Sequence, residues 1–407
     1  MKIIWITYIS SWTPTLLNAI KREVQLALII PSGGFDEFKH VENDVTYYSI
    51  KLKDEERLNS MSLSTFAKYN VVFKDFVPDV IHVHGTEANY AQLQNYTDIP
   101  IITSIQGILS GCIPYYNNFL ENKRLRKFNS LKNLLGYGGI ESIYKGFIKR
   151  SVAYENQILH TGKYFFCRTY WDKAWVMFSN PNANIFQGEE LLRSEFYKES
   201  HSWSVNKCNR HSIFMPSGFN PIKGLYLAVK AVALLKKYYN DITLIVPGIS
   251  YDDVFKNSVW ELIKGEKYIR YVRNIIEEEG LKKNIFFVGR LSAEQMAAKM
   301  KESNVFLSPS SIDNSPNAVG EATMIGIPVV TTPVGGVPSF LRDEESCLFA
   351  PAGDEHMMAY QIMRIFDNDD LATRLSKAAG IVANRRHNIE EVSKAYLNAY
   401  KTITNVQ

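Results

Sequence analysis

The 407-residue chain has only four cysteines, Cys112, Cys167, Cys208 and Cys347, and they form no C-x-x-C pair. This spacing argues against a zinc knuckle and a disulfide framework, so reduced thiols in a cytoplasmic protein are expected. No apolar run approaches the roughly 18 residues that a membrane helix needs. The short apolar stretch after Lys2 is not followed by the small-residue cleavage site of a signal peptide, and it predicts a first strand instead.

Charge and catalytic motifs are also sparse. There are 46 basic and 42 acidic residues, a surplus too small to predict nucleic-acid binding. The patterns G-x-G-x-x-G, the P-loop, H-E-x-x-H and G-x-S-x-G are all missing, which removes the main support for a nicotinamide enzyme, an ATPase, a zinc protease or a serine hydrolase. No metal-ligating cluster is evident, so neither a metal nor a cofactor is expected.

Short apolar runs alternate with helical patterns, which predicts two α/β units with mostly parallel sheets. The length agrees with two domains, and the polar stretch 198–210 is the expected junction, giving domains 1–200 and 201–385. Two similar α/β units predict a cleft between them, with ligands at the carboxyl ends of the strands. The expected strands are 3–8, 25–30, 80–83, 101–105, 212–216, 243–246, 285–288, 305–308 and 327–331, and the expected helices are 65–76, 224–239, 268–279, 293–301, 318–325 and 389–405.

Residues 305–336 (VFLSPSSIDNSPNAVGEATMIGIPVVTTPVGG) carry the clearest functional signal. Ser315 suits an N-cap and Pro316 the first residue of the helix that follows. A helix N-terminus at the carboxyl end of a parallel strand binds anions through its free amides and its dipole. Asp313 and Glu321 stand eight residues apart beside it, where carboxylates suit the hydroxyls of a sugar and a ribose. Spacing alone favours the plainer interpretation, a turn-capping Asp313 and a solvated Glu321.

The segment resembles the donor motif of the retaining glycosyltransferases of family 4 (group 1), which have the GT-B fold. The family's E-x7-E, E-A and G-x-P-V-V appear here as Asp313 to Glu321, Ala322 and residues 326–330. The resemblance implies two Rossmann-like α/β domains facing across a cleft, a C-terminal helix (386–407) packed on the first domain, and a nucleotide diphosphate sugar as donor. It implies that Asp313 orients the donor sugar and Glu321 holds the ribose. Aspartate in place of glutamate draws the first carboxylate back by about 1.3–1.5 Å, one C–C bond.

A second element resembles the family's K-G motif. Lys223 and Gly224 precede an expected helix, and this lysine is expected to grip the donor diphosphate together with the amides of Ser315, Pro316 and Asn317. Gly218 stands roughly where the family has an arginine. Arg290 is a candidate replacement, although a solvated loop arginine is an equal alternative, and a surface lysine is the alternative for Lys223.

The expected acceptor side is residues 78–87, PDVIHVHGTE, followed by IPIITSIQG. His82 and His84 alternate along a strand and therefore share one face. The family often has a histidine hereabouts, so His84 is a candidate catalytic residue, with a satisfied core histidine as the alternative. Many members carry a further histidine after the next strand, where this chain has Gln106.

Residues 121–150 hold eight Lys or Arg against two Glu, with aromatic residues interleaved. Such a segment can lie on an anionic membrane surface, and an ordinary solvated helix pair is the alternative. We therefore expect a cytoplasmic enzyme, peripheral on the inner face of the cell membrane if this segment docks. No nucleic-acid partner is expected.

The expected activity is transfer of a hexosyl-type sugar, with retained configuration and without a metal, to a saccharide or lipid-linked saccharide acceptor. Within the family, the donor segment looks most like bacterial enzymes of capsule and other surface polysaccharide biosynthesis. A nucleotide-sugar epimerase and a degenerate, non-catalytic GT-B partner protein remain as alternatives. The missing arginine, the aspartate for glutamate and Gln106 motivate the latter.

Overall fold

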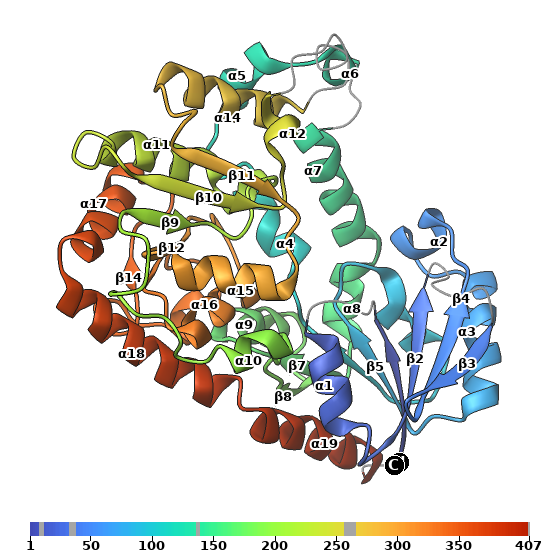
Figure 1. Ribbon diagram of the computed structural model, residues 1–407. Helices are drawn as coiled ribbons and strands as arrows, with labels where there is room; N and C mark the ends of the chain where they lie inside the picture. Colours follow the sequence, from blue (N-terminus) through green and yellow to red (C-terminus); the bar gives the residue numbers. More distant parts are fainter. Residues whose placement is uncertain (8–11, 32–37, 136–138, 256–265, 406–407) are drawn as a thin grey trace. The chain divides into compact units, whose positions relative to one another are not determined.

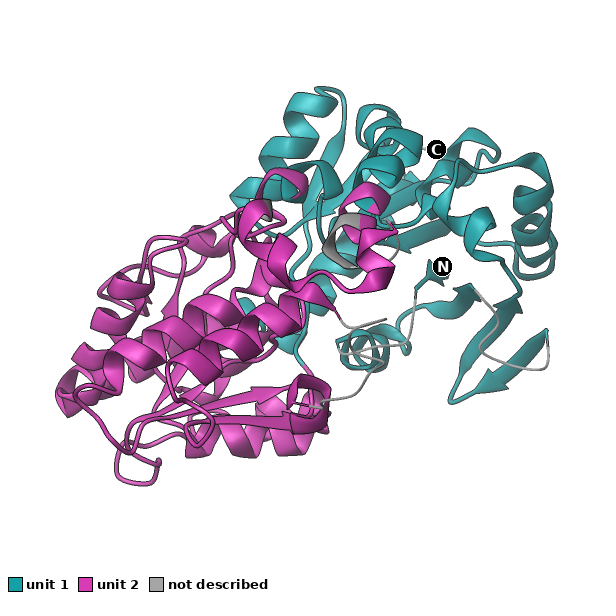
Figure 2. Cartoon of the chain, turned by 90° about the horizontal axis from the view of Figure 1, so that it is seen from above, with its two compact units in different colours: residues 1–112, 147–192, 386–407 teal, residues 113–146, 193–385 magenta. Residues whose placement is uncertain are grey.

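The computed structural model describes residues 1–7, 12–31, 38–135, 139–255 and 266–405 (Figure 1). Tyr8, the last residue of the expected strand 3–8, lies outside the described residues, as do residues 136–138 of the basic segment. The chain divides into two compact units (Figure 2). Unit 1 consists of Met1–Cys112, Phe147–Leu192 and Arg386–Gln407, and unit 2 of Ile113–Gly146 and Arg193–Arg385. The sequence-based division differs from this one, because it placed residues 113–146 and 193–200 in the first domain.

Unit 1 is built on an eight-stranded sheet in the order β3-β4-β2-β1-β5-β6-β7-β8. All neighbouring strands pair in parallel except β3 and β4, which are antiparallel at one edge. Central strands such as β5 are buried along their whole length, as expected for a parallel sheet covered on both faces. The strands are β1 (Lys2–Ile6), β2 (Gln25–Pro31), β3 (Lys39–Glu42), β4 (Val45–Ile50), β5 (Val80–His84), β6 (Ile101–Ser104), β7 (Tyr164–Cys167) and β8 (Asn184–Gln187).

Side chains alternate across β1 and feed two cores, one on each face of the sheet. Ile3 and Trp5 join the core that includes side chains of α1 (Thr13–Ile20) and α19 (Ile389–Asn405). Ile4 and Ile6 join the other core, with side chains of α3 (Leu63–Phe76), α8 (Asn156–Thr161) and α9 (Tyr170–Ser179). The C-terminal helix α19 is thus a covering layer of unit 1. The remaining elements are α2 (Asp54–Leu58), η1 (Asn89–Asn95), α4 (Leu109–Cys112) and η4 (Ser151–Glu155).

Unit 2 has a six-stranded, wholly parallel sheet in the order β11-β10-β9-β12-β13-β14. Its strands are β9 (Ser212–Phe214), β10 (Thr243–Pro247), β11 (Ile285–Gly289), β12 (Val305–Ser308), β13 (Val329–Thr331) and β14 (Leu348–Phe349). Its long helices are α11 (Leu225–Leu235), α14 (Lys267–Glu278), α15 (Ala293–Glu302), α16 (Asn317–Ile325), α17 (Glu355–Phe366) and α18 (Asp369–Arg386). Its short elements are η2 (Ile113–Tyr115), α5 (Asn122–Leu125), η3 (Arg126–Phe128), α6 (Leu131–Leu134), α10 (Ser194–Lys198), η5 (Pro221–Lys223), α12 (Tyr251–Phe255) and η6 (Val337–Ser339).

Two elements continue across a boundary between the units. Helix α7 (Gly139–Arg150) contains the boundary at 146/147, and α18 contains the boundary at 385/386. The chain therefore passes between the units four times, and neither unit is a single stretch of sequence.

The predicted helices and strands are present, with ends that shift by a few residues. Strand 305–308 and helix 389–405 have the predicted bounds. Helix 224–239 is shorter, at Leu225–Leu235, and strand 327–331 starts later, at Val329. Helix α16 begins at Asn317, with Pro316 as its N-cap and no side-chain capping hydrogen bond, so the predicted N-cap role of Ser315 is wrong by one residue.

Candidate functional site

Two loops of unit 2 meet at the carboxyl ends of neighbouring parallel strands. The first follows β9 and leads through η5 into α11, and the second follows β12 and leads into α16. Strands β9 and β12 pair directly, so the loops that leave them lie side by side. The carboxyl edge of a parallel sheet is where ligands bind in such folds.

Lys223 and Asp313, one from each loop, form an ion pair across the two loops. Lys223 Nζ lies 2.5 Å from Asp313 Oδ2, although the residues are 90 positions apart in sequence. The lysine side chain is 37% exposed and the aspartate 16%. Two candidate residues from separate sequence motifs thus share one site, which a ligand from solvent can reach from the lysine side.

The backbone conformation and the surroundings of residue 224 explain why Lys223 is followed by a glycine. Its φ of +77° lies in the left-handed region, which side chains rarely adopt. A Cβ there would also overlap the carbonyl oxygen of Pro309 and lie 2.9 Å from Nδ2 of Asn118. The close approach of the two loops therefore requires glycine at this position.

The loop that carries Asp313 is fixed from its other side. Gly336 N–H donates to the Asp313 carbonyl at 2.9 Å, and the hydroxyl of Thr332 donates to the Ser310 carbonyl at 2.6 Å. A Cβ at Gly335 would overlap the same Asp313 carbonyl. The G-G pair after β13 therefore helps to hold Asp313 opposite Lys223.

The amino end of α16 adjoins this pair. The N–H groups of Val319 and Gly320 donate to the Pro316 carbonyl, so the amides of Asn317 and Ala318 have no acceptor within the helix. Pro316 has no N–H and supplies only backbone shape. Of the expected trio Ser315, Pro316 and Asn317, Pro316 thus offers no donor to a phosphate.

Glu321 is buried in an ion pair that the sequence did not reveal. One edge of the Arg193 guanidinium binds both carboxylate oxygens, with Nε donating to Oε1 at 2.7 Å and Nη2 to Oε2 at 2.8 Å. Burial raises the pKa of Glu321, while the hydrogen bonds from Arg193 act in the opposite direction. The carboxylate keeps lone pairs for a further hydroxyl. Arg193 belongs to no motif in the sequence, so no local pattern could have identified it.

Gly218 occupies a closed position. A Cβ there would lie 2.7 Å from Cδ2 of Leu225 and 3.0 Å from Cγ1 of Val246. A side chain at this position therefore requires the buried Leu225 side chain to shift. Arg290, which follows β11, is exposed and forms no ion pair with a residue that the structure describes.

In unit 1, His82 and His84 lie on one face of β5, as predicted, with ring centroids 4.0 Å apart. His82 is a core histidine: its nitrogens hydrogen-bond with Tyr400 Oη and Ser104 Oγ, each at 2.7 Å. Both nitrogens of His84 are buried without a hydrogen-bond partner among the described residues. Burial lowers the pKa of His84 to about 3, so it is a neutral imidazole at the carboxyl end of β5.

Glu87, which the sequence analysis did not single out, lies close to this strand end. A Cβ at Gly85, just beyond β5, would overlap Glu87 Oε2, and a Cβ at Gly107, after β6, would lie 3.4 Å from Oε1, so the carboxyl group borders both glycines. Burial raises the pKa of Glu87 to about 7, and the charge of Glu155 adds to the rise. A carboxyl that titrates near neutral pH at the carboxyl edge of a sheet is a candidate hydroxyl-binding or proton-transfer group. The sequence signal was present, since Glu87 ends the segment PDVIHVHGTE.

The Glu155 carboxylate has a structural role nearby. It accepts hydrogen bonds from the amides of Leu109 and Ser110, at 2.6 and 2.9 Å, at the start of α4. The buried Arg168 binds the carbonyl of Ile105 at 3.0 Å and Glu190 at 2.7 Å. The side chains of Glu155 and Arg168 thus fix the backbone of the segment that follows β6.

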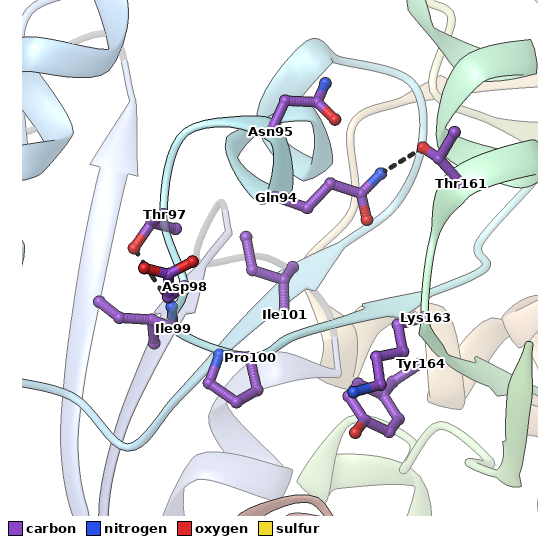
Figure 3. Close-up of a pocket in the computed structure, with 10 residues that line it drawn as sticks. All are labelled: Gln94, Asn95, Thr97, Asp98, Ile99, Pro100, Ile101, Thr161, Lys163 and Tyr164. Carbon is purple, nitrogen blue, oxygen red and sulfur yellow. Dashed lines mark hydrogen bonds between the residues drawn. The ribbon is translucent and has the colours of Figure 1, made fainter. Parts of the chain in front are cut away.

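A cavity of about 410 Å³ in unit 1 lies at the opposite end of the sheet (Figure 3). Pro100 and Ile101 at the start of β6, and Lys163 and Tyr164 at the start of β7, line it. Because it adjoins the amino ends of the strands, it is separate from the candidate residues.

The described residues contain neither a cluster of metal-binding side chains nor a membrane-spanning helix. No group of three or more His, Cys, Asp or Glu side chains among them could hold a metal ion. No helix within the described part of the chain is long and apolar enough to cross a membrane.

Comparison with solved structures identifies the architecture. Sucrose-phosphate synthase from Thermosynechococcus elongatus matches with a TM-score of 0.73 over 100% of both chains, at 15% identity. Anabaena HepE, solved with UDP and glucose, matches with a TM-score of 0.64 over 99% of this chain and 100% of that one, at 14% identity. The two α/β units, with an open and mostly parallel sheet in each, define a GT-B fold.

The sequence comparisons find similarity to known proteins over part of the chain. Residues 198–380 match the model of the glycosyl transferases group 1 family. A phosphatidyl-myo-inositol mannosyltransferase of Mycobacterium leprae is 25% identical over 192 residues, 47% of this chain and 46% of that protein. A putative colanic acid biosynthesis glycosyltransferase, WcaL, of Escherichia coli is 27% identical over 164 residues, 38% of this chain and 36% of that one. The matches thus span less than half of these relatives, and the group 1 match, at residues 198–380, spans less than half of this chain.

Proposed function

We propose that the protein is a retaining glycosyltransferase of family 4 that moves a sugar from a nucleotide diphosphate sugar to a saccharide acceptor. The observation that carries this proposal is the Lys223–Asp313 pair beside the amino end of α16. A cation, a carboxylate and unbonded helix amides meet there, which suits a ligand with both a phosphate and a hydroxylated ring. The group 1 region and the UDP and glucose in the HepE structure support this choice of ligand.

Each residue then has a distinct task in the transfer. As the bond from the sugar to the diphosphate breaks, negative charge grows on the diphosphate, and Lys223 and the amides of α16 stabilise it. Asp313 accepts hydrogen bonds from the donor-sugar hydroxyls. Glu321, oriented by Arg193, accepts one from the ribose. Lys223 and the helix dipole supply the positive charge that a metal would otherwise supply.

We further propose that the acceptor is a lipid-linked saccharide of surface polysaccharide biosynthesis and that the enzyme works at the cytoplasmic face of the membrane. The WcaL match supports polysaccharide synthesis. Leu131, Leu134 and Leu135 are between 55% and 74% exposed, beside Lys127 and Lys132. Exposed leucines with lysines favour reversible binding to anionic lipid.

A thermal-shift panel with UDP, GDP, dTDP, ADP and CMP tests the donor site. A ligand at about 100 times its Kd adds roughly 2.7 kcal/mol, enough to raise the melting temperature by several degrees. We expect one diphosphate to shift the wild type and not Lys223→Ala, while Lys230→Ala on α11 behaves like the wild type. If no nucleotide shifts the wild type, a non-catalytic partner protein becomes the better interpretation.

Two further measurements test the finer proposals. The anomeric configuration of the product, read by NMR against that of the donor, must be retained. Replacing Lys127 and Lys132 with Gln, and Leu134 and Leu135 with Ser, should reduce binding to anionic vesicles but spare turnover of a soluble acceptor. Equal vesicle binding by this variant and the wild type would rule out docking through this segment.

A further inference from the structure

The segment 113–120 lies in the first half of the sequence but packs in unit 2, against both loops of the candidate donor site. Its key residue is Asn118, which is fully buried and has a left-handed φ of +48°. Asparagine tolerates this backbone conformation better than most residues that have a side chain. The Asn118 N–H closes a turn by donating to the Tyr115 carbonyl at 2.9 Å.

The Asn118 side chain bridges the two loops. Its Nδ2 donates to the Pro221 carbonyl at 3.0 Å, and it lies 3.4 Å from the carbonyl oxygens of Ile222 and Pro309. Pro221 and Ile222 directly precede Lys223, and Pro309 is in the loop that carries Asp313. One amide group thus contacts backbone carbonyls from both sides of the ion pair.

Two further hydrogen bonds hold the same turn in place. Tyr226 Oη, on the first turn of α11, donates to the Asn118 carbonyl at 2.6 Å. Ser311 Oγ donates to the Tyr115 carbonyl at 2.7 Å, and Ser311 N–H donates to the Ile222 carbonyl at 2.9 Å. Each loop is therefore tied to the turn and to the other loop.

We infer that Asn118 is a positioning residue for the donor site: by tying the loop of Lys223 to the loop of Asp313, it sets the affinity of this site for a diphosphate. The inference rests on the proposed function, since it takes the diphosphate to bind at Lys223. The Asn118 side chain contacts backbone carbonyl oxygens of both loops. It therefore acts on the ligand by positioning these loops and need not touch the ligand.

The role of the Asn118 amide donor can be tested by two substitutions that remove it. Asn118→Asp preserves the shape of the side chain and its tolerance of a left-handed φ, but it places carboxylate oxygens against the carbonyl oxygens of Pro221 and Pro309. Asn118→Gly keeps the backbone conformation and removes only the side-chain donor. Asn240→Asp makes the same replacement at an exposed position of unit 2 and serves as the matched control.

The experiment measures the affinity of each full-length variant for inorganic pyrophosphate, UDP and uridine by calorimetry, with the melting temperature as the check on folding. We expect Asn118→Asp and Asn118→Gly to lose tenfold or more in affinity for pyrophosphate and UDP. Uridine affinity should change by less than about threefold, and Asn240→Asp should match the wild type. Hydrogen exchange should rise in residues 219–224 and 309–316 and stay unchanged in β9 and β12.

The outcomes separate this inference from the proposed function. If Lys223→Ala loses pyrophosphate affinity while a folded Asn118→Gly keeps it, the positioning role is wrong and the donor site stands. If Lys223→Ala keeps wild-type affinity for pyrophosphate, the donor site itself is wrong and the inference falls with it. Equal losses for uridine and pyrophosphate in Asn118→Gly would indicate general destabilisation and would also overturn the positioning role.

Discussion

Lys223 and Asp313 are counterions of each other in this structure, with 2.5 Å between Nζ and Oδ2. A donor diphosphate must therefore compete with Asp313 for the lysine. Because the lysine is 37% exposed, the pair is weak, and partly exposed pairs contribute about 0–1 kcal/mol. The two roles proposed for this pair, phosphate binding and sugar binding, can be separated by removing the aspartate charge.

Asp313→Asn should have opposite effects on two ligands. Free pyrophosphate should bind about two- to fivefold more tightly, since Lys223 no longer has a competing carboxylate. The complete nucleotide sugar should bind less tightly, because the charged acceptor for its hydroxyls is lost. Titration calorimetry with both ligands measures this, with Glu355→Gln, which frees Lys230 on the same unit, as the control. A parallel loss for both ligands would contradict the assignment.

Restoring the family arginine at Gly218 should not restore a phosphate ligand. The Cβ would meet Cδ2 of Leu225 at 2.7 Å, and overpacking of this kind costs about 1–3 kcal/mol. We expect Gly218→Arg to lower the melting temperature by several degrees without tighter binding of pyrophosphate. Gly146→Ala, in helix α7, adds a Cβ that has no neighbour within 4 Å, so this comparison variant should not lower the melting temperature. Tighter pyrophosphate binding at an unchanged melting temperature would show that the loop can admit the arginine.

Arg193→Met should leave Glu321 as an unpaired buried carboxylate. Breaking a buried ion pair typically lowers the free energy of unfolding by about 3–5 kcal/mol. Because Arg193 is partly exposed, we expect a loss near the lower end, about 3 kcal/mol. The deficit should shrink at acid pH, where Glu321 can protonate, and the double variant with Glu321→Gln should recover most of it. Urea unfolding at pH 5 and pH 8 measures both effects. Lys299→Met, in an exposed pair, should change the free energy of unfolding little.

Glu87→Gln should become relatively more stable than the wild type as the pH rises. Burial raises the pKa of Glu87 from 4.5 to about 7, so the folded state binds a proton that the unfolded state releases between these values. The wild type therefore loses stability from this group between pH 4.5 and pH 7, and the amide variant does not. The difference in melting temperature between variant and wild type should grow from pH 5 to pH 8.

The charged neighbours of Glu87, namely Glu155, Arg168 and Arg150, are present in both proteins, as are the buried histidines, so their own titration largely cancels in this difference. Glu55→Gln, at an exposed position, should give a flat difference. If the difference in melting temperature for Glu87→Gln is also independent of pH, folding does not raise the pKa of the Glu87 carboxyl.

Local patterns predicted the elements well, and the donor segment best. Strand 305–308 is bounded by turn-forming residues and helix 389–405 has a clear apolar stripe, so their ends could be located. Asp313 and Lys223 were singled out by resemblance to the motifs of one family, since spacing alone favoured a turn-capping aspartate. Their side chains meet because β9 lies beside β12 in the sheet. This pairing belongs to the tertiary structure, so local patterns do not predict it.

What the sequence did not predict depends on contacts between distant residues. Arg193 meets Glu321 across 128 positions, and Asn118 meets Pro221 across 103. Neither has a periodic or spaced signature. The sequence-based division placed residues 113–146 in the first domain because they precede the expected junction. Their contacts with unit 2 are tertiary, and no local pattern reveals them.

Helix α19 has a consequence for the order in which the protein can fold. Val392, Tyr396, Ala399, Tyr400 and Ile403 fill one of the two cores of unit 1, and Tyr400 Oη accepts a hydrogen bond from the Trp5 indole N–H at 3.1 Å. During synthesis, the first strand therefore waits for nearly 400 further residues before its outer layer exists. Unit 2, whose residues are all made before α19, can close first, so strand β1 gains its covering layer only after unit 2 is complete.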